Sequence, residues 1–306
     1  MKITIVGAGN VGGLAAMRIA QQGLGEVCLI DIAPGLAKAK SYDLDDCRQI
    51  LRQDYSLTGT EDIAHVSGSH IVVITAGLAR KPGMTREDLL RKNSAILRDV
   101  CLAVKAHASN AVVIVVTNPL DVMTYYAVKT LGFPRERVFG MGVTLDGSRF
   151  ANLIAVHTRV PVSKIKPMVI GSHGEAMLPL ARLTLVDGKP LPEIIKDTAV
   201  IDTLVQRTVD RGKEIVGLLG SGSAYFAPSA AIAQLVAAIA KDQKVTLGVS
   251  AFLRGEYGMS DICIGVPCVV SKNGIEKIVE LALEPQEQKA FRTSAESIKD
   301  LQALFA

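Results

Sequence analysis

The sequence predicts an α/β protein whose first half is a parallel sheet with helices on both faces, followed by an α+β half. Continuous apolar runs alternate with helical patterns up to about residue 142, which is typical of parallel strands buried on both faces. Beyond that point, strand-like segments follow one another through turns that contain glycine, between long helical patterns. We therefore expect two domains, 1–142 and 143–306, that pack as one rigid unit.

The expected elements follow from these patterns in order. In the first half, the expected strands are 2–6, 26–31, 70–76, 111–119 and 137–142, and the expected helices are 10–22, 35–51, 87–107 and 120–131. In the second half, the expected helices are 145–157, 192–217, 224–240 and 284–304, and the expected strands are 165–170, 180–186, 245–253, 261–271 and 274–281. The stretch VDGKP at 186–190 is typical of a hairpin turn.

Composition and charge argue against several classes of protein. The chain has 306 residues, of which 49% are hydrophobic and 21% are charged, as in an ordinary globular protein. A net charge of +4 without a basic stripe gives no support for nucleic-acid binding, and no apolar run is long enough to span a membrane. The five cysteines form no CxxC pair, so we expect reduced thiols in a cytoplasmic protein and no metal site, with a catalytic cysteine as the minor alternative.

The turn GAGNVG at 7–12 indicates a dinucleotide site, because it fits GxGxxG between an expected strand and an expected helix. Gly7 permits the tight turn, Gly9 lets the backbone approach a pyrophosphate, and Gly12 lets the helix pack closely on the strand. The second strand ends at Asp31, where a carboxylate can bind the adenosine ribose and repel a 2′-phosphate. A helix cap is the alternative for Asp31. Together these features predict a Rossmann domain that binds NAD rather than NADP.

Polar residues follow two further strands at the same edge of the expected sheet. Asn118 follows the fourth strand, where its amide can face the nicotinamide ribose or the substrate, although Asn-Pro also forms plain turns. The segment ARKPGMTR at 79–86 follows the third strand and carries Arg80 and Arg86 in a loop. Because a guanidinium matches a carboxylate bidentately, this loop predicts capture of an anionic substrate.

A second group of polar residues is expected to carry chemistry. His173 lies between Gly171 and Gly174, which suggests an exposed position with space around an imidazole that can transfer protons near neutral pH. Asp146 and Arg149 lie three residues apart on one expected helix and share a face. One interpretation is a surface ion pair and a structural histidine. The other pairs Asp146 with His173, which raises the pKa of the imidazole and leaves Arg149 free to bind a carboxylate.

These motifs, in this order and spacing, resemble the lactate/malate dehydrogenase superfamily over essentially the whole chain. They are GAGNVG, Asp31, ITAGLARKPGMTR, VVTNPLDVMT, GVTLDGSRF and IGSHGEAMLPL. The arginine loop is most similar to that of the lactate-dehydrogenase-like bacterial malate dehydrogenases. LDGSR and HGEAM depart from the more frequent LDSAR and HGDTM, but neither change touches Asp146, Arg149 or His173.

The resemblance implies an activity and a role for each matching residue. The implied activity is reversible NAD-dependent oxidation of (S)-malate to oxaloacetate, a tricarboxylic acid cycle reaction, by an NAD-binding domain at 1–142 and a catalytic domain at 143–306. The implied catalytic residues are His173, as proton donor and acceptor, and its partner Asp146. The implied substrate-binding residues are Arg149 for the near carboxylate, Arg86 for the carbonyl, Arg80 for the distal carboxylate, and Asn118. The implied cofactor-binding residues are Gly7, Gly9, Asn10, Val11, Gly12, Asp31, Asn93, Val116 and Asn118.

Arg80 separates the competing hypotheses about substrate. Once Arg149 and Arg86 are assigned to one carboxylate and the carbonyl, Arg80 is a surplus charge, which favours a dicarboxylate. The second hypothesis, a lactate dehydrogenase, needs no cation there. A dehydrogenase that acts on a different 2-hydroxy acid is a further alternative. A dinucleotide sensor without catalysis would need only residues 1–142 and would have no use for Asp146, Arg149 and His173.

The expected partners are a small dicarboxylate and further copies of the chain, with neither nucleic acid nor membrane. The family forms dimers and tetramers, and the apolar faces of helices 35–51 and 224–240 are candidate interfaces. Ser223 has two interpretations, a contact near the nicotinamide or the N-cap of the helix that follows.

Overall fold

The first half of the chain forms the predicted Rossmann sheet. The computed structural model describes residues 1–78 and 86–305, and the side chains of Arg86 and Phe305 lie outside that description. The strands are β1 (Lys2–Val6), β2 (Glu26–Ile30), β3 (Leu57–Thr60), β4 (Ile71–Ile74), β5 (Val112–Val115) and β6 (Val138–Gly140). They run parallel in the order β3-β2-β1-β4-β5-β6. The order reverses beside β1, where ligands of such sheets bind outside the carboxyl ends of the strands.

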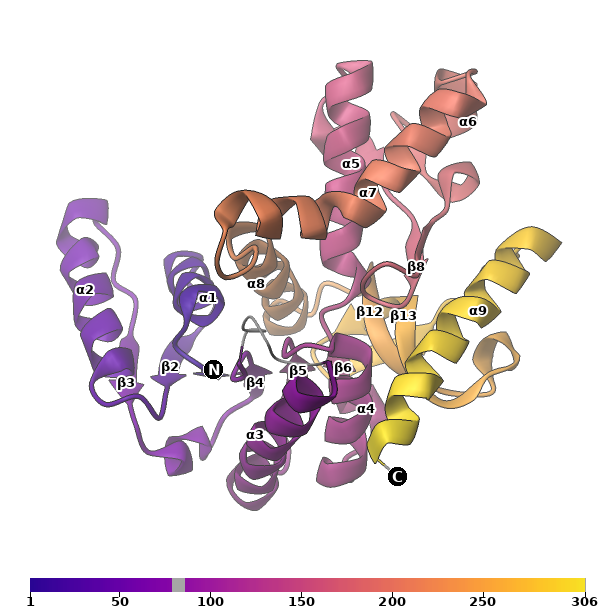
Figure 1. Cartoon of the computed structure of the whole chain (residues 1–306). Helices are drawn as coiled ribbons and strands as arrows, with labels where there is room; N and C mark the ends of the chain where they lie inside the picture. Colours follow the sequence, from indigo (N-terminus) through magenta and orange to yellow (C-terminus); the bar gives the residue numbers. More distant parts are fainter. Residues whose placement is uncertain (79–85, 306) are drawn as a thin grey trace.

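Helices cover both faces of this sheet, as the apolar strands require. They are α1 (Asn10–Gln21), α2 (Leu36–Leu51), α3 (Arg86–His107) and α4 (Leu120–Leu131). Helices α3 and α4 pack together on one face, whereas α1 packs beside α8 on the other (Figure 1). The sequence prediction missed β3, because this edge strand carries a single buried apolar side chain, that of Leu57.

The second half contains further helices and mainly antiparallel strands. The helices are α5 (Val143–Thr158), α6 (Leu191–Ile194), α7 (Thr198–Leu219), α8 (Phe226–Ala240) and α9 (Pro285–Gln302). The strands are β7 (Ile165–Lys166), β8 (Val169–Gly171), β9 (Met177–Pro179), β10 (Leu185–Val186), β11 (Lys189–Pro190), β12 (Val245–Arg254), β13 (Ser260–Ser271) and β14 (Gly274–Ile278). Short 3-10 helices are η1 (Ile63–Val66), η2 (Arg135–Arg137), η3 (Val162–Lys164), η4 (Ala181–Leu183), η5 (Glu256–Gly258) and η6 (Ala303–Phe305).

Three predicted elements of the second half differ from the structure. The strand expected at 165–170 is split into β7 and β8 on either side of Pro167, which cannot donate a ladder hydrogen bond. The strand expected at 180–186 is mostly η4 and retains only the short β10, and the helix expected at 192–217 is divided into α6 and α7. The hairpin turn is present between β10 and β11, with positive φ at Asp187 and Gly188.

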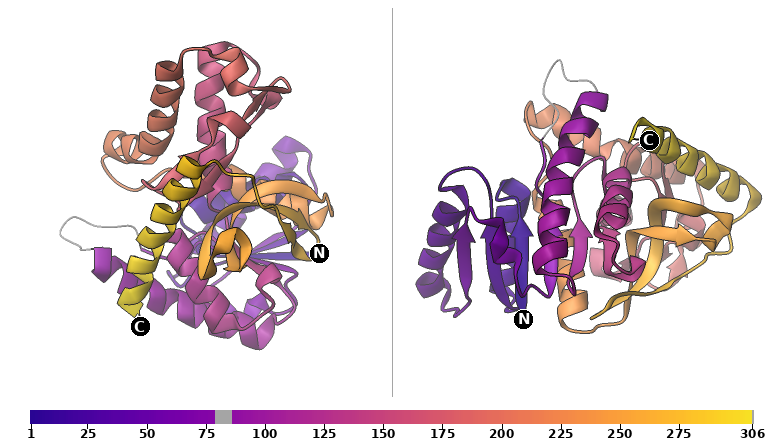
Figure 2. Two further views of the ribbon diagram at one scale, coloured as in Figure 1. Left: turned by 90° about the vertical axis from the view of Figure 1, so that its right-hand side faces the viewer. Right: turned by 90° about the horizontal axis from the view of Figure 1, so that it is seen from below.

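One sheet runs through both halves of the chain. Gly140 of β6 pairs with Ser250 of β12 in antiparallel register, and β13, β8 and β9 continue the sheet beyond it. Figure 2 shows β1 to β3 at one end of the molecule and β12 to β14 at the other. The predicted boundary at residue 142 falls between β6 and α5. Because one sheet continues across this boundary, the division into two domains stays a prediction.

The described residues contain no helix long and apolar enough to cross a membrane. All five cysteines are free, and four of them are buried, which agrees with the expected reduced thiols. Burial raises the pKa of the Cys101 thiol to about 12, so this group is unreactive at neutral pH.

Candidate active site

The glycine turn between β1 and α1 has the geometry of a phosphate-binding turn. Gly7 has φ of 108°, and a Cβ there would lie 2.6 Å from the backbone nitrogen of Ala76. A Cβ on Gly12 would run into the carbonyl oxygen of Gly7, so the helix packs tightly against the turn. Gly9, by contrast, is exposed and has open space around it. The N-terminus of α1, beginning at Asn10, therefore presents free backbone N–H groups to a ligand.

Asp31 lies at the carboxyl end of β2, next to this turn. Its carboxylate accepts hydrogen bonds from the backbone N–H of Ala8 at 2.6 Å and of Ala33 at 2.9 Å. It does not cap α2, whose N-cap is Gly35, so the helix-cap alternative is wrong. The half-buried carboxylate is held beside the glycine turn, where the resemblance puts the ribose.

Sequence reasoning missed Lys40, which approaches the same turn from α2. Its ammonium donates to the carbonyl oxygen of Gly9 at 3.0 Å and lies over Gly13. Burial lowers the pKa of Lys40, and the charge of Asp31 partly offsets this effect. No local pattern marks this lysine, because it is one of two lysines on an amphipathic helix.

The ends of β4 and β5 are tied together by Asn93 of α3. Its side-chain oxygen accepts from the N–H of Leu78 at 2.8 Å, and its amide nitrogen donates to the carbonyl oxygen of Asn118 at 2.8 Å. Asn93 is buried, whereas the predicted ligand-binding residue Asn118 is exposed at the strand end, and Val116 is half-buried beside it. Asn93 is thus bonded to backbone on both sides, and its predicted contact with the cofactor stays a prediction.

Two predicted substrate-binding arginines lie at the edge of what the structure describes. Arg80 falls within 79–85, outside the described residues. Arg86 is the first residue of α3, and its side chain is also outside the description. Their roles stay predictions based on the sequence.

The structure brings His173 and Asp146 together. His173 follows β8 in a turn that Gly171 makes possible, since Gly171 has φ of 93° and a Cβ there would meet the Ser294 hydroxyl at 2.9 Å. The Nδ1 atom of His173 lies 2.8 Å from Oδ2 of Asp146, which is fully buried in the first turn of α5. The imidazole is 13% exposed, so the expectation of an exposed histidine is wrong.

Arg149 completes this group from the next turn of α5. Its guanidinium donates to Oδ1 of Asp146 at 3.2 Å and is only 11% exposed, so the surface-ion-pair interpretation is wrong. Its buried Nε atom has no hydrogen-bond partner among the described residues. A buried guanidinium with an unused donor is costly unless an anion binds to it. A buried guanidinium donor without an acceptor is the structural feature expected of a carboxylate site.

The charges around the imidazole favour its protonated form. Burial opposes protonation, but the charge and hydrogen bond of Asp146, with the charge of Asp121, outweigh burial and raise the pKa of His173. The charge of Arg149 acts in the opposite direction. For Arg149 itself, burial lowers the pKa, and Asp146 partly compensates. The arrangement is that of a general acid and base oriented by a carboxylate.

A second buried carboxylate, Asp121, touches the same turn and was missed by sequence reasoning. It is the second residue of α4 and is 4% exposed. Oδ2 accepts from the backbone N–H of His173 at 2.7 Å, and Oδ1 accepts from the hydroxyl of Ser250 at 2.6 Å. The only signal in the sequence is an acid directly after an apolar residue in NPLD, and this also fits an ordinary first-turn acid.

Ser223 is an exposed residue of the loop before α8. The N-cap of α8 is Tyr225, so the N-cap interpretation of Ser223 is wrong. A contact with the nicotinamide stays a prediction.

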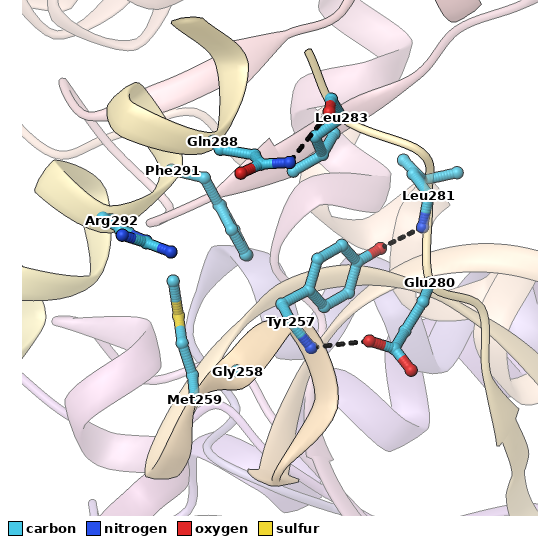
Figure 3. Close-up of a pocket in the computed structure, with 9 residues that line it drawn as sticks. All are labelled: Tyr257, Gly258, Met259, Glu280, Leu281, Leu283, Gln288, Phe291 and Arg292. Atoms are coloured by element: carbon cyan, nitrogen blue, oxygen red, sulfur yellow. Dashed lines mark hydrogen bonds between the residues drawn. The ribbon is translucent and has the colours of Figure 1, made fainter. Parts of the chain in front are cut away.

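A separate cavity of about 350 Å³ lies between α9 and the turn that contains η5 (Figure 3). No predicted site residue in the described part of the chain lines it. The Tyr257 hydroxyl donates to the carbonyl oxygen of Val279 and accepts from the N–H of Leu281, and the Tyr257 N–H donates to Glu280. The polar groups of Tyr257 are therefore satisfied by neighbouring residues.

Comparison with known proteins identifies the class to which this fold and site belong. Residues 1–140 match the NAD binding domain of lactate/malate dehydrogenase, and residues 143–303 match the alpha/beta C-terminal domain of the same family. The chain belongs to the lactate/malate dehydrogenase family, and NAD is the cofactor of its first half.

Particular members of the family are similar over nearly the whole chain. A malate dehydrogenase of Methanosarcina acetivorans is 47% identical over 298 residues, which are 97% of each chain. The crystal structure of a Cryptosporidium parvum malate dehydrogenase has a TM-score of 0.96 at 37% identity, covering 99% of this chain and 98% of that one. A lactate dehydrogenase from the same organism, complexed with lactic acid and nicotinamide adenine dinucleotide, has a TM-score of 0.95 at 38% identity, covering 99% and 97%.

Proposed function

We propose that this protein is a malate dehydrogenase that interconverts (S)-malate and oxaloacetate with NAD. The observation that carries the proposal is the buried group of His173, Asp146 and Arg149, which unites a proton carrier with a guanidinium that has an unused donor. Relatives at 44–47% identity named malate dehydrogenase support the choice of substrate.

The cofactor fits the residues present at the carboxyl ends of β1 and β2. Gly9 leaves space for a pyrophosphate to approach the N-terminus of α1, and Asp31 is held where it can bind ribose hydroxyls. A carboxylate at this place disfavours a 2′-phosphate, so we propose a preference for NAD over NADP. When bound, NAD supplies or accepts the hydride.

His173 moves the proton in the proposed mechanism. During reduction of oxaloacetate, Nε2 of the imidazolium donates a proton to the carbonyl oxygen, and in the reverse direction neutral Nε2 accepts the hydroxyl proton of malate. Asp146 holds Nδ1 at 2.8 Å, which fixes the orientation of the ring and stabilises the imidazolium. Arg149 binds the carboxylate next to the reacting carbon.

The loop arginines would set substrate choice. We propose that Arg86 polarises the carbonyl and that Arg80 binds the distal carboxylate, which pyruvate lacks. Replacement of Arg80 by Gln would leave that carboxylate without its cation, at a cost of roughly 2–5 kcal/mol. Steady-state kinetics of Arg80→Gln should therefore show a large loss with oxaloacetate and little loss with pyruvate. An equal loss with both substrates would show that Arg80 is not the selector.

The similarity to lactate dehydrogenases makes pyruvate reduction the competing activity. Initial rates with oxaloacetate and pyruvate, each with NADH and with NADPH, decide between them. We expect oxaloacetate with NADH to have the highest kcat/KM. A higher kcat/KM with pyruvate would overturn the malate assignment, and no turnover in any combination would favour the dinucleotide sensor.

We further propose that the enzyme acts in the tricarboxylic acid cycle, in the cytoplasm and as a homo-oligomer, either dimer or tetramer. Helix α2 supports the last point, because it exposes Tyr42, Ile50 and Leu51. The apolar face of α8 is already covered within the chain by α1 and β13, so α2 is the better candidate for an interface. Sedimentation velocity of the wild-type protein and of Ile50→Asp tests the proposed oligomer and its interface at α2. We expect the wild type to sediment as a dimer or tetramer and the variant to dissociate.

A further inference from the structure

We propose that Asp121 is a positioning residue for His173, and that it holds the histidine turn in place through the backbone rather than through the ring. This inference rests on the proposed role of His173 in proton transfer. Asp146 controls the imidazole from α5, whereas Asp121 reaches the same residue from α4, in the other half of the chain.

The contacts of Asp121 connect three separate elements. Its Oδ2 accepts from the N–H of His173 at 2.7 Å, and its Oδ1 accepts from the Ser250 hydroxyl on β12 at 2.6 Å. Ser250 itself pairs with Gly140 of β6, where the two halves of the sheet join. One carboxylate therefore fixes the loop after β8 relative to α4 and to the junction between β6 and β12.

Burial makes this arrangement sensitive to change. Asp121 is 4% exposed and Ser250 is fully buried, so water cannot replace a lost acceptor without cost. The histidine turn is flanked by Gly171 and Gly174, which both have positive φ. The neighbouring Ser172 N–H donates to the Ser294 hydroxyl of α9 at 2.8 Å. Asp121 and Ser294 thus hold two consecutive peptide groups of this turn.

The N-terminus of α4 favours the ionised form of Asp121, because the carboxylate lies in the first turn of the helix. Burial acts the other way and raises the pKa of Asp121, while the bonds from Ser250 and His173 partly compensate. Among the described residues, the charges that act on the pKa of His173 are those of Asp121, Asp146 and Arg149, and the charge of Asp121 also acts on the Cys263 thiol of β13. Removal of the charge of Asp121 should therefore lower the pKa of His173.

Two substitutions separate the positioning role from the charge. Asp121→Asn keeps an oxygen that can accept from the His173 N–H but removes the charge, whereas Asp121→Ala removes the acceptor. We expect kcat to fall about 100-fold in Asp121→Ala, as for a catalytic group displaced by about 1 Å, and to recover to within about 5-fold of the wild type in Asp121→Asn. The Kd for NADH should change less than threefold in both variants.

Thr124→Val is the matched control, because Thr124 is a fully buried polar residue of the same helix whose hydroxyl donates only within α4, to Leu120. We expect wild-type kcat for this variant. Circular dichroism and thermal unfolding establish whether each variant is folded. If Asp121→Ala does not fold, Ser250→Ala decides the question, because it removes the hydroxyl that holds Oδ1 of Asp121 and leaves the charge in place. We expect a lower kcat and a lower His173 pKa in Ser250→Ala, and wild-type values for both overturn the proposal.

The second readout is the imidazole pKa of His173, measured by NMR titration of ¹³C-labelled histidine in the full-length protein. A lower pKa in Asp121→Ala than in Asp121→Asn supports the proposal, because both variants lose the charge but only the alanine variant loses the contact that holds His173 beside Asp146. Equal pKa values and equal kcat in folded Asp121→Ala and Asp121→Asn overturn it. This titration needs no turnover, so it distinguishes failure of this inference from failure of the proposed activity.

Discussion

The two ends of the candidate site are constructed in different ways. At the cofactor end, the glycine turn and Asp31 lie within the first 31 residues, and the backbone at Gly9 is exposed. At the catalytic end, Asp121, Asp146 and His173 come from three separate elements and are largely buried. Recognition by backbone needs one local turn, whereas an oriented proton carrier needs side chains brought together from distant positions.

The largest expected effect tests the catalytic end. Replacement of His173 by Asn removes the proton carrier, so kcat for oxaloacetate should fall by roughly 10²–10⁴-fold. The Kd for NADH should stay close to that of the wild type, because the cofactor end is unchanged, and fluorescence titration measures it. Near-wild-type turnover would exclude His173 as the general acid and base.

A smaller effect is expected for Asp146→Asn, which should lower kcat by about 100-fold and change its pH dependence. Asp146 raises the pKa of His173, and oxaloacetate reduction needs the imidazolium, so kcat/KM falls as the pH rises through that pKa. Without the carboxylate this fall should occur at lower pH. Asp187→Asn, at an exposed ion pair with Lys164, is the control and should leave the pH profile unchanged.

The same pKa shift has a defined effect on stability. Because the pKa of His173 is raised in the folded state, the pair with Asp146 contributes fully to stability below the ordinary value of 6.5. This contribution is lost as the pH rises through the folded-state pKa. Denaturant unfolding of wild type and Asp146→Asn from pH 5 to 9 should therefore show a stability difference that narrows with rising pH.

Substitution of Asp31 tests whether the cofactor end affects cofactor binding without affecting the catalytic end. Asp31→Ser should raise the KM for NADH by about 10- to 100-fold, as expected for loss of hydrogen bonds to a charged group worth roughly 1.5–3 kcal/mol. The selectivity for NADH over NADPH should fall, whereas kcat at saturating cofactor should stay within about threefold. A fall in kcat with unchanged KM would contradict the separation of the two ends.

The smallest expected effect concerns the contact between the halves. Ser229 of α8 is fully buried and accepts a hydrogen bond from Nε of Arg18 on α1 at 3.0 Å. Ser229→Ala should lower the free energy of unfolding by about 1 kcal/mol without changing kcat. Thermal unfolding measures the loss. Thr203→Ala, which removes a bond within α7, is the control and should have less effect.

The fold was largely predictable because its signals are local and periodic. The run IVVI of β4 is buried on both faces, and its apolar pattern made the strand evident. The sequence does not predict β3, because an edge strand buries few apolar side chains. It predicts a strand at 180–186 instead of η4, because a helix of three residues has no periodic pattern that distinguishes it from a short strand. Pro167 indicates a break within 165–170, but the apolar residues around it favour a single strand, and the sequence therefore predicts one strand where the structure has two.

The sequence by itself determined the glycine turn, the acid at the end of β2 and the identity of the residues able to transfer a proton or bind a carboxylate. These depend on backbone conformation and side-chain chemistry, which nearby residues specify. Only the tertiary structure decided that Asp146 lies 2.8 Å from Nδ1 of His173, that Arg149 is buried with an unused donor, and that Asp121 holds the histidine backbone. Such contacts join residues far apart in the chain, and their distances and burial exist only once the sheet has brought the two halves together.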